Sequence, residues 1–103
     1  MSERAPAVEV ADVTLARLRE QILDNDLAIV EAFNRRLELV REIRRHKAGH
    51  GLPFLDLARE EWMLRYLMRA NPGPLSEEGL AELFAELLDL TKREVARADG
   101  NGG

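Results

Sequence analysis

The stretch from Asp12 to Lys47 contains no proline and no glycine, and leucine, alanine, arginine and glutamate dominate it. These residues are strong helix formers, so the stretch is expected to form one long helix. A seven-residue apolar repeat runs along it, which is typical of a helix that packs lengthwise against another helix. The repeat occupies two neighbouring rows, Leu15, Ile22, Ile29 and Ile43 in the first and Leu18, Ala32 and Leu39 in the second.

Two shorter helices are expected after the long one. Gly49, Gly51 and Pro53 interrupt the pattern, and Asp56 is then placed as the N-cap of a helix that ends near Ala70. Ser76 is expected to cap a third helix that ends near residue 98, with glutamates in its first turn. The apolar stripe of this helix consists of Leu80, Leu83, Phe84, Leu87, Leu88, Thr91 and Val95.

The domain organisation follows from these elements. Residues 1–11 and the tail 99–103 lack periodicity and are expected to be disordered, which leaves one helical domain over residues 12–98. At 1.5 Å per residue the first helix would be roughly 50 Å long, against a diameter of roughly 30 Å for a small domain. Part of its stripe would stay in water unless a second chain covered it. We therefore expect an all-α chain of three helices that forms a homodimer around paired first helices.

Composition excludes several kinds of function. The 103 residues include no cysteine, so disulfides, thiolate metal clusters and a cysteine nucleophile are excluded. The net charge is −4 and glutamates alternate with arginines, which weakens the case for nucleic acid as the main partner. No apolar run approaches the roughly 20 residues of a membrane-spanning helix, and the first residues lack a signal core. We expect a soluble, cytoplasmic protein that does not bind membranes.

Three cationic residues on the long helix are candidates for binding a small anion. Arg36 occupies a position of the first row where the repeat asks for an aliphatic side chain, and a buried unpaired charge costs several kcal/mol. Lys47 lies on the same face, about 16 Å further along, whereas Arg19 lies roughly 25 Å before Arg36. Antiparallel pairing of two such helices would bring Arg19 of one chain toward Arg36 of the other. Alternatively, Arg36 reaches the surface, Lys47 favours the helix C-terminus and Arg19 pairs with nearby glutamates.

Asp56, Arg59 and Glu60 form a charged cluster at the start of the second helix. On composition alone such a cluster is an ordinary helix cap, and a binding role would bring a guanidinium and carboxylates toward Lys47. His46 and His50 have no partners at the spacing of metal ligands, and both are expected to face solvent.

The ordered set of these residues resembles the all-helical class of chorismate mutases, in its bacterial form. The resemblance runs from about Leu15 to Val95 and rests on Leu18-Arg19-Glu20, Asp26, Arg35-Arg36, Lys47, Asp56-Leu57-Ala58-Arg59-Glu60 and Leu75-Ser76. It implies an intertwined dimer of three-helix chains with two equivalent sites, each shared between the chains. The substrate of this family is chorismate, a small dianion, and neither a metal nor an organic cofactor is needed.

The resemblance also implies a role for each matched residue. Arg19 corresponds to an arginine that the other subunit donates to a ligand carboxylate, and Arg36 to one that grips a carboxylate within the chain. Lys47 corresponds to the lysine that contacts a carboxylate and the ether oxygen of the bond that breaks. Asp56 and Glu60 correspond to the pair that binds the substrate hydroxyl. Two further positions match, namely the site-ordering arginine at Arg59 and a small hydroxyl residue near a carboxylate at Thr91.

One position departs from the family pattern. The family has a glutamine or glutamate facing the ether oxygen four residues beyond Thr91, where this sequence has Val95. Glu94 is adjacent but lies about 100° away around an ideal helix. Either the last turn is shifted so that Glu94 enters the site, or the ether oxygen has only Lys47.

The reaction implied is the Claisen-type rearrangement of chorismate to prephenate in the biosynthesis of phenylalanine and tyrosine. Alternatives on the same fold are an isochorismate-pyruvate lyase, which Glu60 argues against, and a mutase for aminochorismate. A non-catalytic helical dimer that binds a metabolite or a partner enzyme of the shikimate pathway is a further alternative, which the absence of the usual donor at Val95 leaves open. Any regulatory or dehydratase function is expected to lie on another chain.

Overall fold

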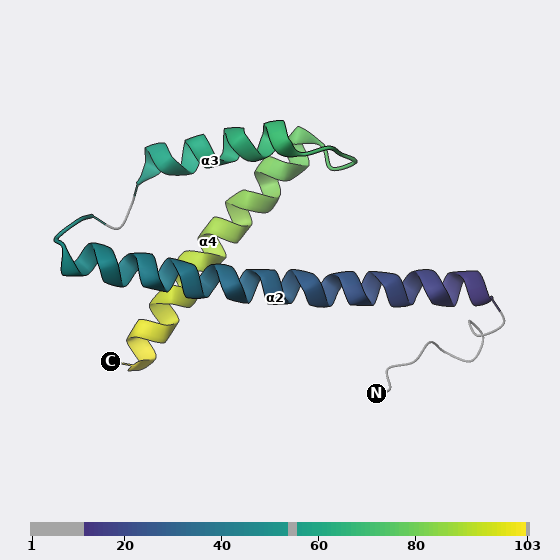
Figure 1. Cartoon of the computed structure of the whole chain (residues 1–103), viewed down its shortest axis with the longest axis horizontal. Helices are drawn as coiled ribbons and strands as arrows, with labels where there is room; N and C mark the ends of the chain where they lie inside the picture. The colour runs from purple at the N-terminus through teal and green to yellow at the C-terminus, as the bar shows by residue number, and fades with distance from the viewer. Residues whose placement is uncertain (1–11, 54–55, 103) are drawn as a thin grey trace. The chain divides into compact units, whose positions relative to one another are not determined.

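The computed structural model of the chain describes residues 12–53 and 56–102, with side chains as far as residue 98. The described residues form three α-helices and no strand: α2 (Val13–Gly49), α3 (Leu57–Ala70) and α4 (Glu77–Gly102) (Figure 1). This confirms the all-α fold with one very long first helix. The chain divides into two units, Met1–Arg36 and Leu37–Gly103. The expectation for residues 1–11 lies outside the described residues.

Helix α2 begins and ends with recognisable caps. The Asp12 carboxylate accepts a hydrogen bond from the backbone N–H of Leu15 (3.1 Å). At the other end Gly51 adopts a positive φ of 69°, and the N–H of Leu52 donates to the carbonyl of Lys47 (2.7 Å). This is a Schellman motif, in which a left-handed glycine lets the chain satisfy the last carbonyls of a helix. The helix therefore extends two residues beyond its predicted end and fixes the backbone of Lys47 in its last turns.

The turn between α3 and α4 is held by side-chain hydrogen bonds. Asn71 accepts from the N–H of Gly73 (3.0 Å) and donates to the carbonyl of Leu75 (2.8 Å). Gly73 has a φ of 86°, a backbone conformation that glycine adopts without steric cost. Ser76 then caps α4, because its hydroxyl oxygen accepts from the N–H of Gly79 (2.9 Å). The predicted N-caps of α3 and α4 are thus both confirmed.

Helix α4 continues to Gly102, although the sequence predicted a helix end near Ala98 and a disordered tail. Glycine and asparagine are weak helix formers, but no proline follows Ala98 to stop the helix. Once a helix is formed, each added residue gains a hydrogen bond without repeating the cost of nucleation. Helix α4 therefore runs four residues past its predicted end.

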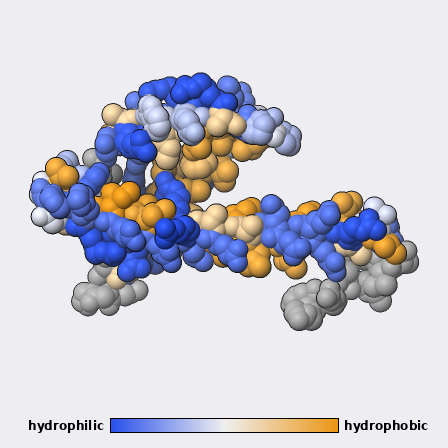
Figure 2. All heavy atoms as spheres, viewed as in Figure 1, coloured by the Kyte–Doolittle hydropathy of each residue, from blue (hydrophilic) through white to orange (hydrophobic). Residues whose placement is uncertain are grey.

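Apolar side chains are buried to very different extents on the two longest helices. Leu80 and Val95 of α4 are buried and Leu83, which the sequence placed on the same stripe, is 51% exposed. On α2 no residue is buried. Nine large apolar side chains of α2 are 41–65% exposed, and Figure 2 shows hydrophobic residues (orange) at its surface between hydrophilic ones (blue). They are Val13, Leu18, Ile22, Leu23, Leu27, Ile29, Val30, Leu39 and Ile43.

Within the part of the chain that the structure describes, none of the helices combines the length and apolar character needed to cross a bilayer.

Candidate active site

The N-cap and the first turn of α3 carry three of the candidate residues, Asp56, Arg59 and Glu60. Asp56 precedes the helix, and its Oδ1 accepts a hydrogen bond from the backbone N–H of Arg59 (3.0 Å). This bond satisfies one of the amide groups that a helix N-terminus leaves unpaired. A carboxylate has two oxygens and about four lone-pair directions, so Asp56 keeps acceptor capacity for a ligand hydroxyl. The cap thereby orders both the Asp56 carboxylate and the backbone that carries Arg59.

The Arg59 guanidinium lies over the ring of Trp62, further along α3. Its Cζ lies 4.7 Å from the ring centroid of Trp62. Trp62 in turn stacks on Tyr66, with centroids 5.4 Å apart and ring planes inclined by 10°. Sequence reasoning missed this arrangement, although the spacing of three and then four residues already places the three side chains on one face of a helix.

Glu60 connects α3 to α4. Its Oε2 lies 3.9 Å from Nζ of Lys92, with side-chain exposures of 29% and 45% respectively. Lys92 directly follows Thr91, so the ion pair links the first turn of α3 to the turn of α4 that carries another candidate residue. Lys92 was not among the predicted residues, because a contact between two helices leaves no periodic signal in the sequence.

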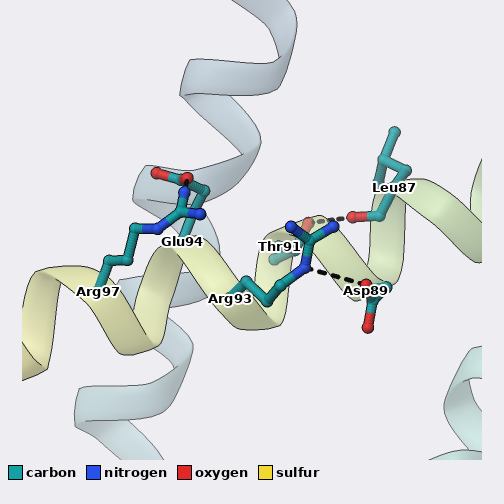
Figure 3. A network of polar contacts seen from close by, with 6 residues as sticks. All are labelled: Leu87, Asp89, Thr91, Arg93, Glu94 and Arg97. Carbon is teal, nitrogen blue, oxygen red and sulfur yellow. Dashed lines mark hydrogen bonds and ion pairs between the residues drawn. The ribbon is translucent and has the colours of Figure 1, made fainter.

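Thr91 and Val95 lie on the same buried face of α4. Thr91 is 4% exposed and Val95 is 2% exposed. The hydroxyl of Thr91 donates to the carbonyl of Leu87 one turn earlier (2.7 Å), as Figure 3 shows. Residues four apart share a helix face, so Thr91 and Val95 point to the same side of α4.

Glu94 forms an ion pair with Arg97 on α4 (Figure 3), and its side chain is 34% exposed. Helix α4 is continuous from Glu77 to Gly102, so no shift of register brings Glu94 onto the face of Val95. An ionised carboxylate accepts hydrogen bonds and has no proton to donate. A role for Glu94 at the ether oxygen stays a prediction.

The remaining candidates lie on α2. Arg36 and Lys47 are half-buried, and Arg19 is exposed. His46 and His50 are exposed, as the sequence predicted. Their ring centroids lie 4.2 Å apart, and Nδ1 of His50 hydrogen-bonds to the carbonyl oxygen of His46 (2.9 Å).

Comparison with known proteins identifies the family. The family model of chorismate mutase type II matches residues 18–95, which is most of the chain and includes every candidate residue. The chain belongs to the chorismate mutase family. The predicted resemblance is therefore confirmed.

Solved structures and curated relatives agree with this assignment. A chorismate mutase from Thermus thermophilus (form II) has a TM-score of 0.76 and 34% identity, covering 82% of this chain and 96% of that one. Form I of that enzyme gives a TM-score of 0.73 and 36% identity, covering 76% and 98%. The bifunctional chorismate mutase/prephenate dehydratases of Pseudomonas aeruginosa and Stutzerimonas stutzeri are each 32% identical over 72% of this chain. The chain spans 22% of the length of these two curated relatives.

Proposed function

We propose that this chain catalyses the rearrangement of chorismate to prephenate. The observation that carries the proposal is the structural match to the Thermus enzyme, which spans 96% of that chorismate mutase at 34% identity. The charged residues of the matched region supply a chemical reason. The cations suited to two carboxylates and an ether oxygen are Arg19, Arg36, Lys47 and Arg59. The carboxylates suited to a hydroxyl are Asp56 and Glu60.

The proposed mechanism is positioning followed by electrostatic stabilisation. Arg36 of one chain and the partner subunit's Arg19 hold the two substrate carboxylates by charge-assisted hydrogen bonds. The carboxylates of Asp56 and Glu60 bind the ring hydroxyl by accepting the hydrogen that it donates. This grip favours the compact conformer in which the reacting carbons are close, which lowers the entropic part of the barrier. Lys47 donates to the ether oxygen as its bond to carbon breaks and negative charge develops there. No bond to the protein forms at any stage.

A homodimer built on α2 completes the proposed site. The apolar side chains of α2 are about half exposed in the single chain, and a second copy would cover them. The charges of α2 favour an antiparallel pair. Residues 13–34 carry two basic and four acidic side chains, whereas residues 35–49 carry six basic and two acidic ones. Antiparallel pairing sets opposite charges against each other and brings Arg19 of one chain toward Arg36 of the other.

The buried Val95 gives a specific prediction about rate. Substitution Val95→Gln places an amide donor on the face of Thr91, and a single donor to a developing oxyanion is worth up to about 10²–10³ in kcat. We expect kcat to rise by about tenfold, because a newly introduced donor is less well oriented than one in an evolved site. Burying the amide should lower the free energy of unfolding by about 1–3 kcal/mol. Steady-state kinetics and urea denaturation measure the two effects.

Glu94→Gln is the matched control for this substitution. It introduces the same amide one position away, on the side of α4 where Glu94 pairs with Arg97. We expect it to change kcat by less than about twofold. An increase in kcat with Glu94→Gln and none with Val95→Gln would show that Glu94, not Val95, faces the ether oxygen.

The experiment that tests the proposed function is incubation of the purified chain with chorismate, with isochorismate and with aminochorismate in parallel, and identification of the products by NMR. Catalytic formation of prephenate supports the proposal. Salicylate and pyruvate from isochorismate would instead identify a lyase. Turnover of the amino compound alone would identify an aminochorismate mutase, and absence of turnover with all three would refute the proposal for the isolated chain.

A further inference from the structure

Arg59, Trp62 and Tyr66 form an exposed cluster on α3, in which the Arg59 guanidinium lies over the Trp62 ring and the Trp62 ring stacks on Tyr66. The Arg59 Cζ lies 4.7 Å from the Trp62 centroid, and Trp62 lies 5.4 Å from Tyr66 with nearly parallel rings. Trp62 is 45% exposed and Tyr66 is 50% exposed. Burial in the core of the chain therefore does not account for two large aromatic side chains at these positions.

Stacking leaves a guanidinium able to bind a carboxylate. The five N–H donors of arginine point outward from Cζ in several directions, so a ring on one side of the group leaves donors on the other sides for a carboxylate. A cation over the face of a tryptophan is attracted by the ring quadrupole, so the stack limits the orientations that Arg59 samples without occupying its donors. Tyr66 restricts Trp62 in the same way by offset stacking.

The backbone and the guanidinium of Arg59 are each held by a separate contact. Its backbone N–H is bound to Asp56 Oδ1 (3.0 Å), and its guanidinium lies over Trp62. A side chain that is ordered before the ligand arrives loses less conformational entropy on binding. Arginine has among the largest side-chain entropies, so the benefit of such ordering is greatest for this residue type.

We propose that Trp62, supported by Tyr66, is a positioning residue that holds the Arg59 guanidinium ready for a carboxylate-bearing substrate at the start of α3. This inference rests on the proposed function for the nature of the substrate. Trp62 itself does not contact the substrate and acts through Arg59.

The test compares Trp62→Leu and Trp62→Phe in chains that carry either Arg59 or Arg59→Ala. A cation–π contact at an exposed site corresponds to about a two- to fivefold change in an equilibrium or rate. We expect Trp62→Leu to lower kcat/KM for chorismate by about that factor, mostly through KM, and Trp62→Phe to retain most of the activity. In the Arg59→Ala chain, Trp62→Leu should have no further effect, because the residue it positions is gone.

A purely structural role for Trp62 gives a different pattern. Trp62→Leu would then lower kcat/KM equally in both backgrounds, and this result, or full activity of Trp62→Leu with Arg59 present, overturns the inference. Trp62 is the single tryptophan of the chain, so its fluorescence reports on the stack directly. Arg59→Ala should shift the emission, and the product prephenate should perturb it in the unmodified chain but not in Arg59→Ala.

These readouts separate the inference from the proposed function. An unmodified chain that does not convert chorismate contradicts the proposed function, whatever Trp62 does. A chain that converts chorismate but shows additive effects at positions 59 and 62 contradicts only the positioning role.

Discussion

Replacing Lys47 with methionine is expected to lower kcat for chorismate by about 10²–10³-fold, the usual loss when one donor to a developing oxyanion is removed. The Val95 side chain has no hydrogen-bond donor, and the Glu94 carboxylate is paired with Arg97. The proposed mechanism therefore assigns the donor at the ether oxygen to Lys47. Methionine keeps the length of the side chain while removing its charge. The Schellman motif uses the Lys47 carbonyl and not its side chain, so the end of α2 should stay intact.

The control for Lys47→Met is Arg45→Met, which removes a cation two residues away on the exposed surface of α2. This variant should retain kcat within about twofold, because surface substitutions away from a site have small effects. Steady-state kinetics with chorismate measures both variants. If Lys47→Met kept more than a tenth of the rate, another group would have to stabilise the ether oxygen.

Replacing Arg36 with alanine is expected to lower kcat/KM by at least about 10²-fold, since truncating one partner of a desolvated charge pair costs about 2–5 kcal/mol. The dimer should persist, because alanine is the best helix former and fits the apolar row that Arg36 interrupts. Both KM and kcat should change, since the carboxylate contact binds the substrate and also fixes its reactive conformer. Sedimentation and steady-state kinetics measure the two expectations together.

Arg41→Ala is the matched control for Arg36→Ala, because it removes an exposed arginine from the same helix. Its kcat/KM should stay within about twofold of the unmodified chain. Full activity of Arg36→Ala would show that the carboxylate-binding residues are assigned wrongly. Loss of the dimer in Arg36→Ala would assign this residue to assembly instead.

Local signals in the sequence were sufficient to predict most of the fold. The caps at Asp56 and Ser76 follow from short-range chemistry, because the side chain and the amide it binds are three residues apart. Helix α4 ends four residues beyond the predicted end because the prediction relied on apolar periodicity, which the tail lacks, whereas propagation of a helix that has already formed outweighs weak propensities. The prediction for α2 stopped two residues early because Gly49 was counted as an interruption of the pattern, whereas the left-handed glycine that ends the helix is Gly51.

The candidate site was less accessible to sequence reasoning. Asp56, Glu60 and Thr91 could be matched to a family by order and type, and these roles remain predictions. The contact between Glu60 and Lys92 could not be foreseen, because it depends on how α3 and α4 pack. The stack of Arg59 on Trp62 was within reach, since the spacing alone places the two side chains on one face.

The measurement that tests the central claim most directly is activity in a hybrid dimer. The claim is that this chain forms an antiparallel dimer whose sites rearrange chorismate with Arg36 of one chain and Arg19 of the other. We expect dimers of Arg19→Ala chains and dimers of Arg36→Ala chains each to be inactive. The two variants are unfolded together, refolded as a mixture and assayed for formation of prephenate. Half of the random dimers are then hybrids with one intact site, so about a quarter of the unmodified activity should return. A mixture that stays as inactive as its components, although hybrid dimers are detected by mass spectrometry, would contradict the shared site.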